Sequence, residues 1–143
     1  MQGQGAELLE SAPVSSTRPH DQSLDQQMVE AAFVCDLLRV RDLLKQGASP
    51  DARDEEDRTP LFAAVLGGSI ALVGLLIEAK ADVNARDDEG NTPLGRAVFA
   101  ARGRHEVVRL LRRSGARDDL PNAAGETPRQ LAERLGENVF TSN

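Results

Sequence analysis

Few residues of this chain have types and spacings suited to catalysis. Nucleophilic catalysis needs a nucleophile, a base beside it and a group that orients the base. The single cysteine, Cys35, and the two histidines, His20 and His105, are far apart in the sequence, and no Cys/His spacing typical of a metal site is present. Gly67-Gly68 is too short for a phosphate-binding loop and no lysine follows it. We therefore expect no enzyme activity, no cofactor and no metal.

Two acidic clusters, 54–57 and 87–89, are the next candidates for chemistry. A calcium loop needs converging oxygens and a bidentate glutamate at fixed spacing, which neither cluster has. Two interpretations stay open: the clusters are solvated loop tips, or they form an electronegative rim for a basic partner.

A basic cluster lies further along the chain. It is either a solvated face, a second contact surface, or one side of a dimer in which this face meets the acidic one. Its members are Arg102, Arg104, His105, Arg109, Arg112, Arg113 and Arg117. Because the formal net charge is −6, the composition argues against a nucleic-acid partner. The uncharged run from Leu61 to Ile77 reaches the lower limit of a membrane span, but Gly67 and Gly68 interrupt it, so we expect no membrane helix.

The elements that position these residues repeat along the chain. Thr59-Pro60-Leu61 returns as Thr92-Pro93-Leu94 and again as Thr127-Pro128, a period of about 33 residues that is typical of a helical repeat array. Each threonine can cap a helix through its hydroxyl, and each proline suits the first helical position. Each pair is preceded by a polar connection. A second apolar helix is expected after the first helix in the repeats that start at Thr59 and Thr92, whereas in the last repeat the second helix is short or missing.

Further features of the chain follow from this period. We expect Val40, Val73 and Val108 to share one buried column, and Leu43, Leu76 and Leu111 another. Residues 1–22 lack an apolar period and are interpreted as a flexible tail, after which Ser23 and Gln26 form a capping box that starts the first helix. Lys80 stands where Gly47 and Gly115 end the equivalent helices, which predicts a left-handed lysine.

The Thr-Pro-Leu starts, together with Leu72-Val73, Leu75-Leu76-Ile77 and Ala81-Asp82-Val83-Asn84-Ala85, resemble the ankyrin repeat over residues 24–140. The resemblance implies an all-α repeat solenoid of about four stacked helix-turn-helix repeats, at 23–54, 55–87, 88–122 and 123–143, whose terminal repeats are caps. It also implies β-hairpin fingers before each first helix, with Gly90, Gly125 and Asp57 at positive φ. The acidity and small size resemble bacterial ankyrin proteins.

By the same resemblance, we expect a non-catalytic module that binds another protein on a concave strip of finger tips and exposed first-helix positions, with Leu66 and Phe99 as apolar anchors. The predicted contact residues are Glu55, Glu56, Arg58, Leu66, Asp88, Glu89, Asn91, Phe99, Ala123, Ala124, Glu126 and Arg134. The chain is expected to be monomeric and cytoplasmic, an adaptor or inhibitor of a partner with a basic surface. Alternatives are a toxin-neutralising or enzyme-regulating ankyrin protein and a structural spacer.

Overall fold

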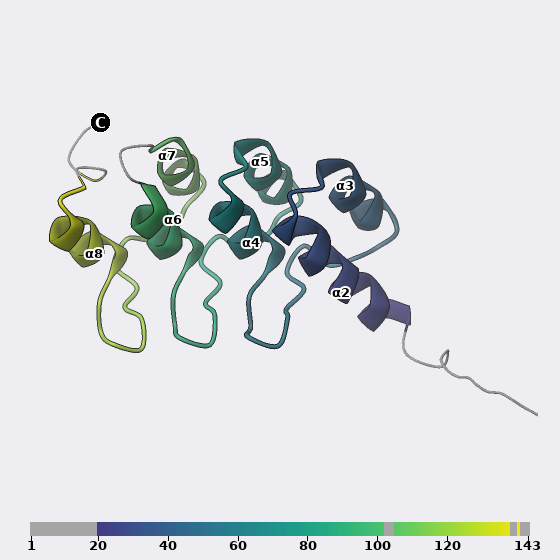
Figure 1. Cartoon of the computed structure of the whole chain (residues 1–143), viewed down its shortest axis with the longest axis horizontal. Helices are drawn as coiled ribbons and strands as arrows, with labels where there is room; N and C mark the ends of the chain where they lie inside the picture. The colour runs from purple at the N-terminus through teal and green to yellow at the C-terminus, as the bar shows by residue number, and fades with distance from the viewer. Residues whose placement is uncertain (1–19, 102–104, 138–139, 141–143) are drawn as a thin grey trace, which may run out of the picture.

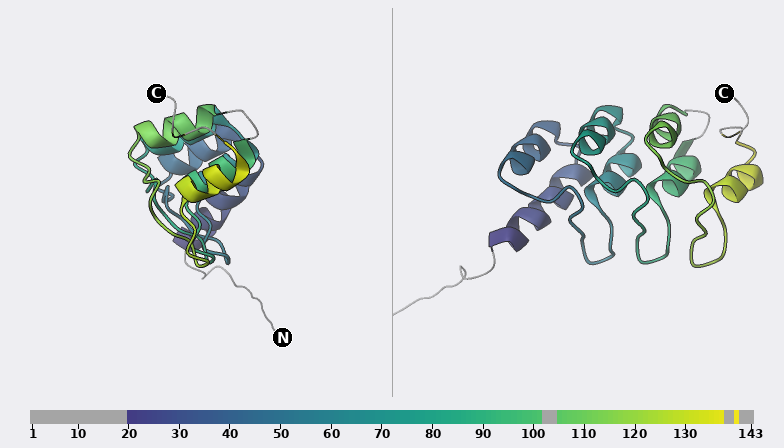
Figure 2. Two further views of the ribbon diagram at one scale, coloured as in Figure 1. Left: turned by 90° about the vertical axis from the view of Figure 1, so that its left-hand side faces the viewer. Right: turned by 180° about the vertical axis from the view of Figure 1, so that it is seen from behind.

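The computed structural model describes residues 20–101, 105–137 and 140, and these residues form seven helices. In chain order the helices are α2 (His20–Phe33), α3 (Leu37–Lys45), α4 (Pro60–Gly67), α5 (Ile70–Glu78), α6 (Pro93–Ala101), α7 (Glu106–Arg113) and α8 (Pro128–Leu135). They stack side by side as the pairs α2–α3, α4–α5 and α6–α7 followed by α8, and the long connections between pairs project from one side (Figures 1 and 2). The predicted all-α repeat solenoid is therefore confirmed.

The Thr-Pro pairs start the inner helices α4, α6 and α8 as predicted. In each case the threonine Oγ1 accepts a hydrogen bond of 3.1–3.3 Å from the N–H three residues later, and proline is the first helical residue. In α8, the Gln130 side chain also accepts from the Thr127 N–H, which completes a capping box. Asp36 caps α3 in the same way through the Arg39 N–H.

The predicted start of the first helix is wrong. Helix α2 begins at His20, three residues before Ser23, so Ser23 does not stand at the start of the helix and residues 20–22 of the predicted tail are helical. No glycine or proline stands in this stretch to interrupt the helix, and α2 lacks the Thr-Pro pair that fixes the start of the later inner helices. The rest of the predicted tail, 1–19, lies outside the described residues.

The core follows the two columns that the sequence predicts. Val40, Val73 and Val108 have no exposed surface, and Leu43, Leu76 and Leu111 are 3% exposed or less. In the first pair Arg39 is exposed, whereas Leu72, its equivalent in the second pair, is fully buried. Each pair thus buries its own apolar face and packs against the next pair.

The connections before α4, α6 and α8 are hairpin-shaped turns, here called finger 1 (53–58), finger 2 (86–91) and finger 3 (121–126). Within the described ranges none of them forms a β-strand, although the resemblance implied β-hairpins. Each turn is closed by two backbone hydrogen bonds, for example Asp54 N–H to the Arg58 carbonyl (3.1 Å) and Asp57 N–H to the Asp54 carbonyl (3.0 Å). Two hydrogen bonds are enough to close a tight turn, but a β-strand needs a longer series of backbone hydrogen bonds between paired segments.

The predicted left-handed residues are confirmed. Asp57 (φ 61°) takes the place that Gly90 (78°) and Gly125 (84°) hold in the later fingers, and Lys80 has φ 72°. Sequence reasoning missed a third non-glycine case, Cys35 (φ 55°), which occupies the turn position held by Gly68 (φ 71°) one repeat later.

Candidate functional site

The exposed positions of the inner helices form one column along the stack. Leu66 is 44% exposed and Phe99 57% exposed, and Arg134 is exposed at the same position of α8. Sequence reasoning missed the first member, Phe33 of α2, which is half-buried and stands one repeat before Leu66. The same period that links Leu66 to Phe99 points to Phe33. We call these four residues the inner-helix column.

The finger tips are exposed and are tied to one another. Glu55, Glu56, Asp88, Glu89, Ala123 and Ala124 are all exposed at the tips. The Asp88 N–H donates to the Glu56 carbonyl at 3.1 Å, and the Ala123 N–H donates to the Glu89 carbonyl at 2.9 Å. A Cβ at position 90 would lie 2.9 Å from the Ala123 nitrogen, so this close approach and the positive φ both require Gly90. The tips therefore form one row.

The side chain of the second residue of each finger holds the turn together by accepting backbone hydrogen bonds. Asp54 and Asp87 each accept two backbone N–H bonds of 2.9 Å on one carboxylate oxygen, and the amide oxygen of Asn122 does the same at 2.9 and 3.0 Å. Burial raises the pKa of Asp54, but hydrogen bonds from the N–H groups of Arg58 and Glu56 and from the Arg58 side chain outweigh it and leave this pKa below its usual value. Asp54 and Asp87, parts of the two acidic clusters, therefore have a structural role.

In fingers 1 and 2, arginines neutralise part of the acidic charge that the sequence suggests. Arg58 pairs with Asp54 at 2.9 Å and with Glu56 at 2.5 Å, and its guanidinium lies 4.6 Å above the Phe33 ring. Arg96 of α6, which sequence reasoning did not single out, lies 3.5 Å from Glu89 and 3.9 Å from Asp87. The predicted contact residue Arg58 is thus held within its own finger.

In finger 3 the predicted contact residues Arg134 and Glu126 pair with each other, at 2.8 and 3.0 Å. The hydrogen bond from Arg134 lowers the pKa of Glu126. Asn91, also predicted, accepts from the Asn122 amide at 3.1 Å and so links fingers 2 and 3. Finger 1 holds four carboxylates, finger 2 three and finger 3 one, so the acidity of the row declines toward its C-terminal end.

The basic cluster is also partly paired. The Arg112 guanidinium lies 4.9 Å from the Phe140 ring, Arg117 binds Asp119 at 3.0 and 3.1 Å, and His105 Nε2 is 2.9 Å from a Glu137 carboxylate oxygen. Positions 102 and 104 lie outside the described residues. Arg109 and Arg113 are exposed on α7.

Of the described residues, Cys35 lies in the α2–α3 turn and His105 precedes α7, two repeats further along the stack, so these two side chains do not form a Cys–His pair. Across the described positions, no group of three or more His, Cys, Asp and Glu side chains is arranged to hold a metal ion. None of the described helices is both long and apolar enough to cross a membrane.

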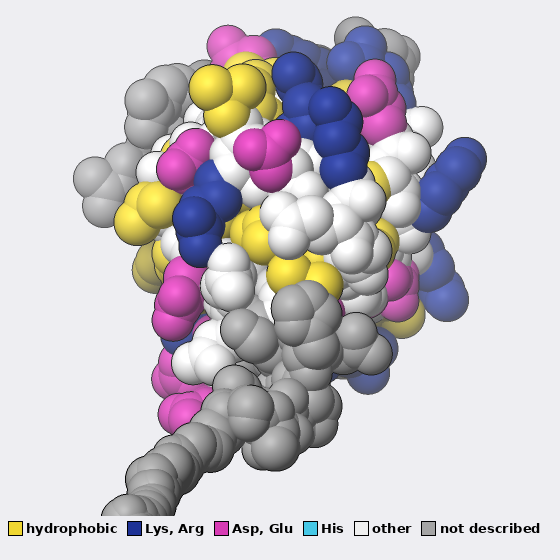
Figure 3. Space-filling view, turned by 90° about the vertical axis from the view of Figure 1, so that its right-hand side faces the viewer, with side chains coloured by type: hydrophobic (Ala, Val, Ile, Leu, Met, Phe, Trp, Pro, Cys, Tyr) yellow, Lys and Arg dark blue, Asp and Glu magenta, His cyan; other side chains and the backbone are white. Residues whose placement is uncertain are grey.

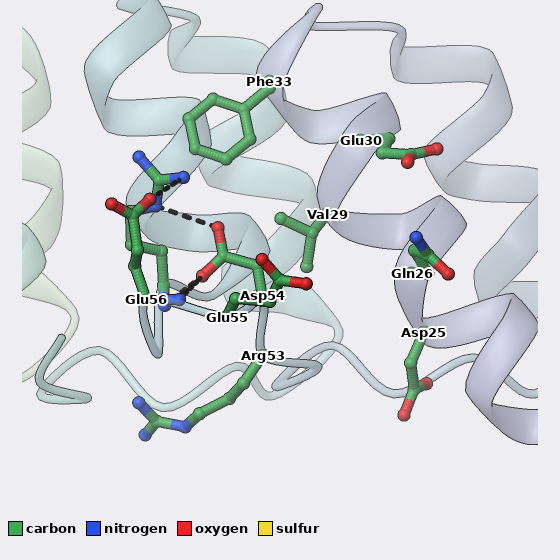
Figure 4. A pocket seen from close by; sticks show the side chains of 10 residues that line it. Asp25, Gln26, Val29, Glu30, Phe33, Arg53, Asp54, Glu55 and Glu56 are labelled. Carbon is green, nitrogen blue, oxygen red and sulfur yellow. Dashed lines mark hydrogen bonds and ion pairs between the residues drawn. The ribbon is translucent and has the colours of Figure 1, made fainter. Parts of the chain in front are cut away.

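A pocket of about 850 Å³ opens where the finger row begins, between α2 and finger 1 (Figure 4). Helix α2 supplies Asp25, Gln26, Val29, Glu30 and Phe33, and finger 1 supplies Arg53, Asp54, Glu55, Glu56 and Arg58. From this end of the stack, acidic side chains gather along the lower left edge of the surface, toward the finger side (Figure 3). Sequence reasoning missed the α2 wall because its predicted contact residues begin at Glu55 of finger 1 and include no residue of α2.

The stacked helix pairs, the capped helix starts and the row of fingers are the architecture of a helical repeat protein. A model of ankyrin repeats in three copies matches residues 28–138, so the chain belongs to the ankyrin repeat family. Ankyrin repeats generally act as protein–protein interaction modules and are typically non-catalytic.

Three relatives are animal proteins. The chain is 41% identical over 99 residues to human ankyrin repeat domain-containing protein 63, covering 68% of this chain and 26% of the relative, and the mouse protein of that name matches equally, with 25% of its length covered. Dauer abnormal formation protein 25 of Caenorhabditis elegans is 37% identical over 128 residues, 89% of this chain and 30% of that protein. The chain thus spans about a quarter to a third of these relatives. The bacterial-type resemblance stays a prediction.

Proposed function

We propose that this chain is a non-catalytic module that binds another protein on the inner-helix column and the finger tips beside it. The observation that carries the proposal is the exposure of Leu66 and Phe99, large apolar side chains on the outward side of α4 and α6, whereas Leu61, Val65 and Val98 of the same helices are buried in the core. Exposed apolar groups that line one face mark contact sites more often than scattered ones do.

The proposed partner has a basic surface. Glu55 and Asp88 have no ion pair within the described part of the chain, so these two tip carboxylates keep their charge available to a partner. The role is that of an adaptor or inhibitor, a monomer in the cytoplasm that masks the partner's basic surface. Rim charges mainly set the association rate and partner choice, whereas apolar anchors set the lifetime of the complex.

The test compares matched variants in capture from cells of the source organism and then in binding kinetics with the purified partner. Phe99→Ala should speed dissociation, with a loss of about 1–3 kcal/mol of binding free energy. Leu38→Ala is the control, because Leu38 is 69% exposed on the outer helix α3 and lies off the strip. Glu55→Lys with Asp88→Lys should slow association, and more so at low salt.

A second control separates the two faces. Arg109→Glu with Arg113→Glu reverses exposed charges on α7 and should leave binding unchanged. If these α7 variants abolish binding while Phe99→Ala and the finger variants are silent, the strip is not the site and the proposal fails.

A further inference from the structure

The finger row has an open edge at its N-terminal end. Finger 2 donates the Asp88 N–H to the carbonyl of finger 1, and finger 3 donates the Ala123 N–H to the carbonyl of finger 2. One repeat earlier, the equivalent donor is the N–H of Glu55, which has no acceptor among the described residues. An unpaired backbone donor at the edge of an ordered row is a template for pairing with another extended chain.

The space beside this edge is held by a helix instead of another finger. Helix α2 has 14 residues, whereas α4 has eight, and its N-terminal turns extend down beside finger 1 (Figure 1). The pocket of about 850 Å³ between them falls within the range of roughly 300–1,000 Å³ that is usual for ligand sites. It is large enough for a short stretch of chain with its side chains.

The pocket combines an apolar wall with unbalanced negative charge. Val29 and Phe33 of α2 form the wall that faces finger 1, and the Glu55 carboxylate points from the finger toward α2 (Figure 4). Five carboxylates and two arginines line the pocket. One arginine, Arg58, is already paired with two of those carboxylates, and the other, Arg53, donates to the carbonyls of Asp57 and Arg86.

We propose that this pocket binds an extended segment of the partner protein that carries an arginine or lysine. A backbone carbonyl of the segment accepts from the Glu55 N–H, as the Glu56 carbonyl accepts from Asp88 in the neighbouring finger. The cationic group pairs with the Glu55 carboxylate, and its aliphatic stem packs on the half-buried Phe33, because Val29 beside it is only 3% exposed. This inference rests on the proposed function, because it names the chemistry of the partner at one end of the strip.

Charge complementarity favours a partner over the chain's own N-terminal residues. Positions 1–19 contain two glutamates and one arginine, so they do not offer the positive charge that the pocket lacks.

Amide hydrogen exchange of the ¹⁵N-labelled full chain tests the open edge. In the free chain, the Glu55 amide should exchange fast, whereas those of Asp88 and Ala123 should be protected by their bonds to the preceding finger. A Glu55 amide that is already protected in the free chain would overturn the proposal, because the chain itself would then cover the edge.

Titration with short peptides tests whether the pocket binds an extended segment that carries arginine. The acetylated and amidated peptide Thr-Arg-Val-Arg-Thr should shift the Glu55, Val29 and Phe33 signals in a saturable way and slow exchange of the Glu55 amide. The counterpart Thr-Glu-Val-Glu-Thr should do neither. Glu55→Gln should weaken binding of the arginine peptide by about threefold or more. Asp88→Asn, the position-matched control in finger 2, should leave it nearly unchanged.

The peptide titration and the Phe99→Ala variant together separate this inference from the proposed function. Equal shifts with both peptides, or shifts spread evenly over fingers 1 and 2, would overturn the pocket assignment. Phe99→Ala should not affect the peptide, since Phe99 lies two repeats away. A partner that is lost with Phe99→Ala while the peptide fails to bind would leave the proposed function standing and refute only the pocket.

Discussion

Lys80 offers a direct test of how strongly the repeat geometry constrains the backbone. It follows α5 with φ 72°, where its N–H bonds to the Ile77 carbonyl at 2.9 Å and the next N–H bonds to the Leu76 carbonyl at 3.0 Å. The same pair of bonds ends α3 and α7, and there the residue is Gly47 or Gly115. A side chain in this left-handed conformation costs about 1 kcal/mol relative to glycine.

Lys80→Gly should therefore raise the free energy of unfolding by about 1 kcal/mol, or the melting temperature by roughly 3–5 °C for a domain of this size. The opposite change, Gly115→Ala, should lower stability by about 1–2 kcal/mol through the backbone alone, because a Cβ there would meet no atom within 4 Å. Circular dichroism during urea denaturation is the assay, since the chain has neither Trp nor Tyr to report by fluorescence.

The matched control is the preceding residue. Ala79 has φ −81°, so Ala79→Gly relieves no strain and should destabilise by about 0.5–1 kcal/mol through the extra freedom of the unfolded chain. If Lys80→Gly destabilises as Ala79→Gly does, the left-handed backbone at Lys80 carries no cost and the reasoning is refuted.

Two other positions can be tested in the same assay. Gly67→Ala places a Cβ 2.5 Å from the Cys35 sulfur and should lower the free energy of unfolding by about 1–3 kcal/mol. In a Cys35→Gly background the same substitution should cost much less, and strictly additive effects of the two substitutions would contradict this contact. Asp54→Asn should flatten the acid dependence of stability and keep the finger turn, because Asn122 makes the same bonds with an amide oxygen, whereas Asp54→Ala should cost about 1–3 kcal/mol at pH 7. The folded pKa of Asp54 is lowered, so its contribution is present above the ordinary value of 3.8 and is lost as pH falls through the folded pKa; an unchanged pH slope in Asp54→Asn would count against it.

The repeat architecture could be predicted because its signals are local and periodic. Thr59 caps its helix through a bond to a residue three positions away, and the left-handed positions recur with the period, so each is visible in a short window. The same period, applied more strictly, would have found the left-handed Cys35 from Gly68. The start of α2 was missed because Ser23 is an acceptable capping residue in sequence but is not needed where the helix can continue.

The charge of the strip could not be predicted from sequence in the same way. Arg96 reaches Glu89 and Asp87 from a helix that follows the finger, and Arg58 is held by a ring on α2 that belongs to the preceding repeat. Such pairs depend on which side chains the stacking of repeats brings together, and no spacing rule within one repeat gives them. Counting carboxylates therefore overstated the acidity of the row.

The two ends of the finger row differ in ways that bear on how a partner would approach. At the C-terminal end, finger 3 has one carboxylate, Glu126, and Arg134 binds it. At the N-terminal end, finger 1 has four carboxylates, a Glu55 N–H without an acceptor among the described residues, and an apolar wall on α2. With their own arginines counted, finger 1 (four carboxylates, Arg53 and Arg58) and finger 2 (three carboxylates, Arg86) each keep a net charge of −2, whereas Arg134 neutralises the one carboxylate of finger 3. Because long-range attraction acts first on the most charged region, a basic partner should meet fingers 1 and 2 before it settles along Leu66 and Phe99. Charge changes at Glu55 should then alter the association rate more than equal changes at Glu126.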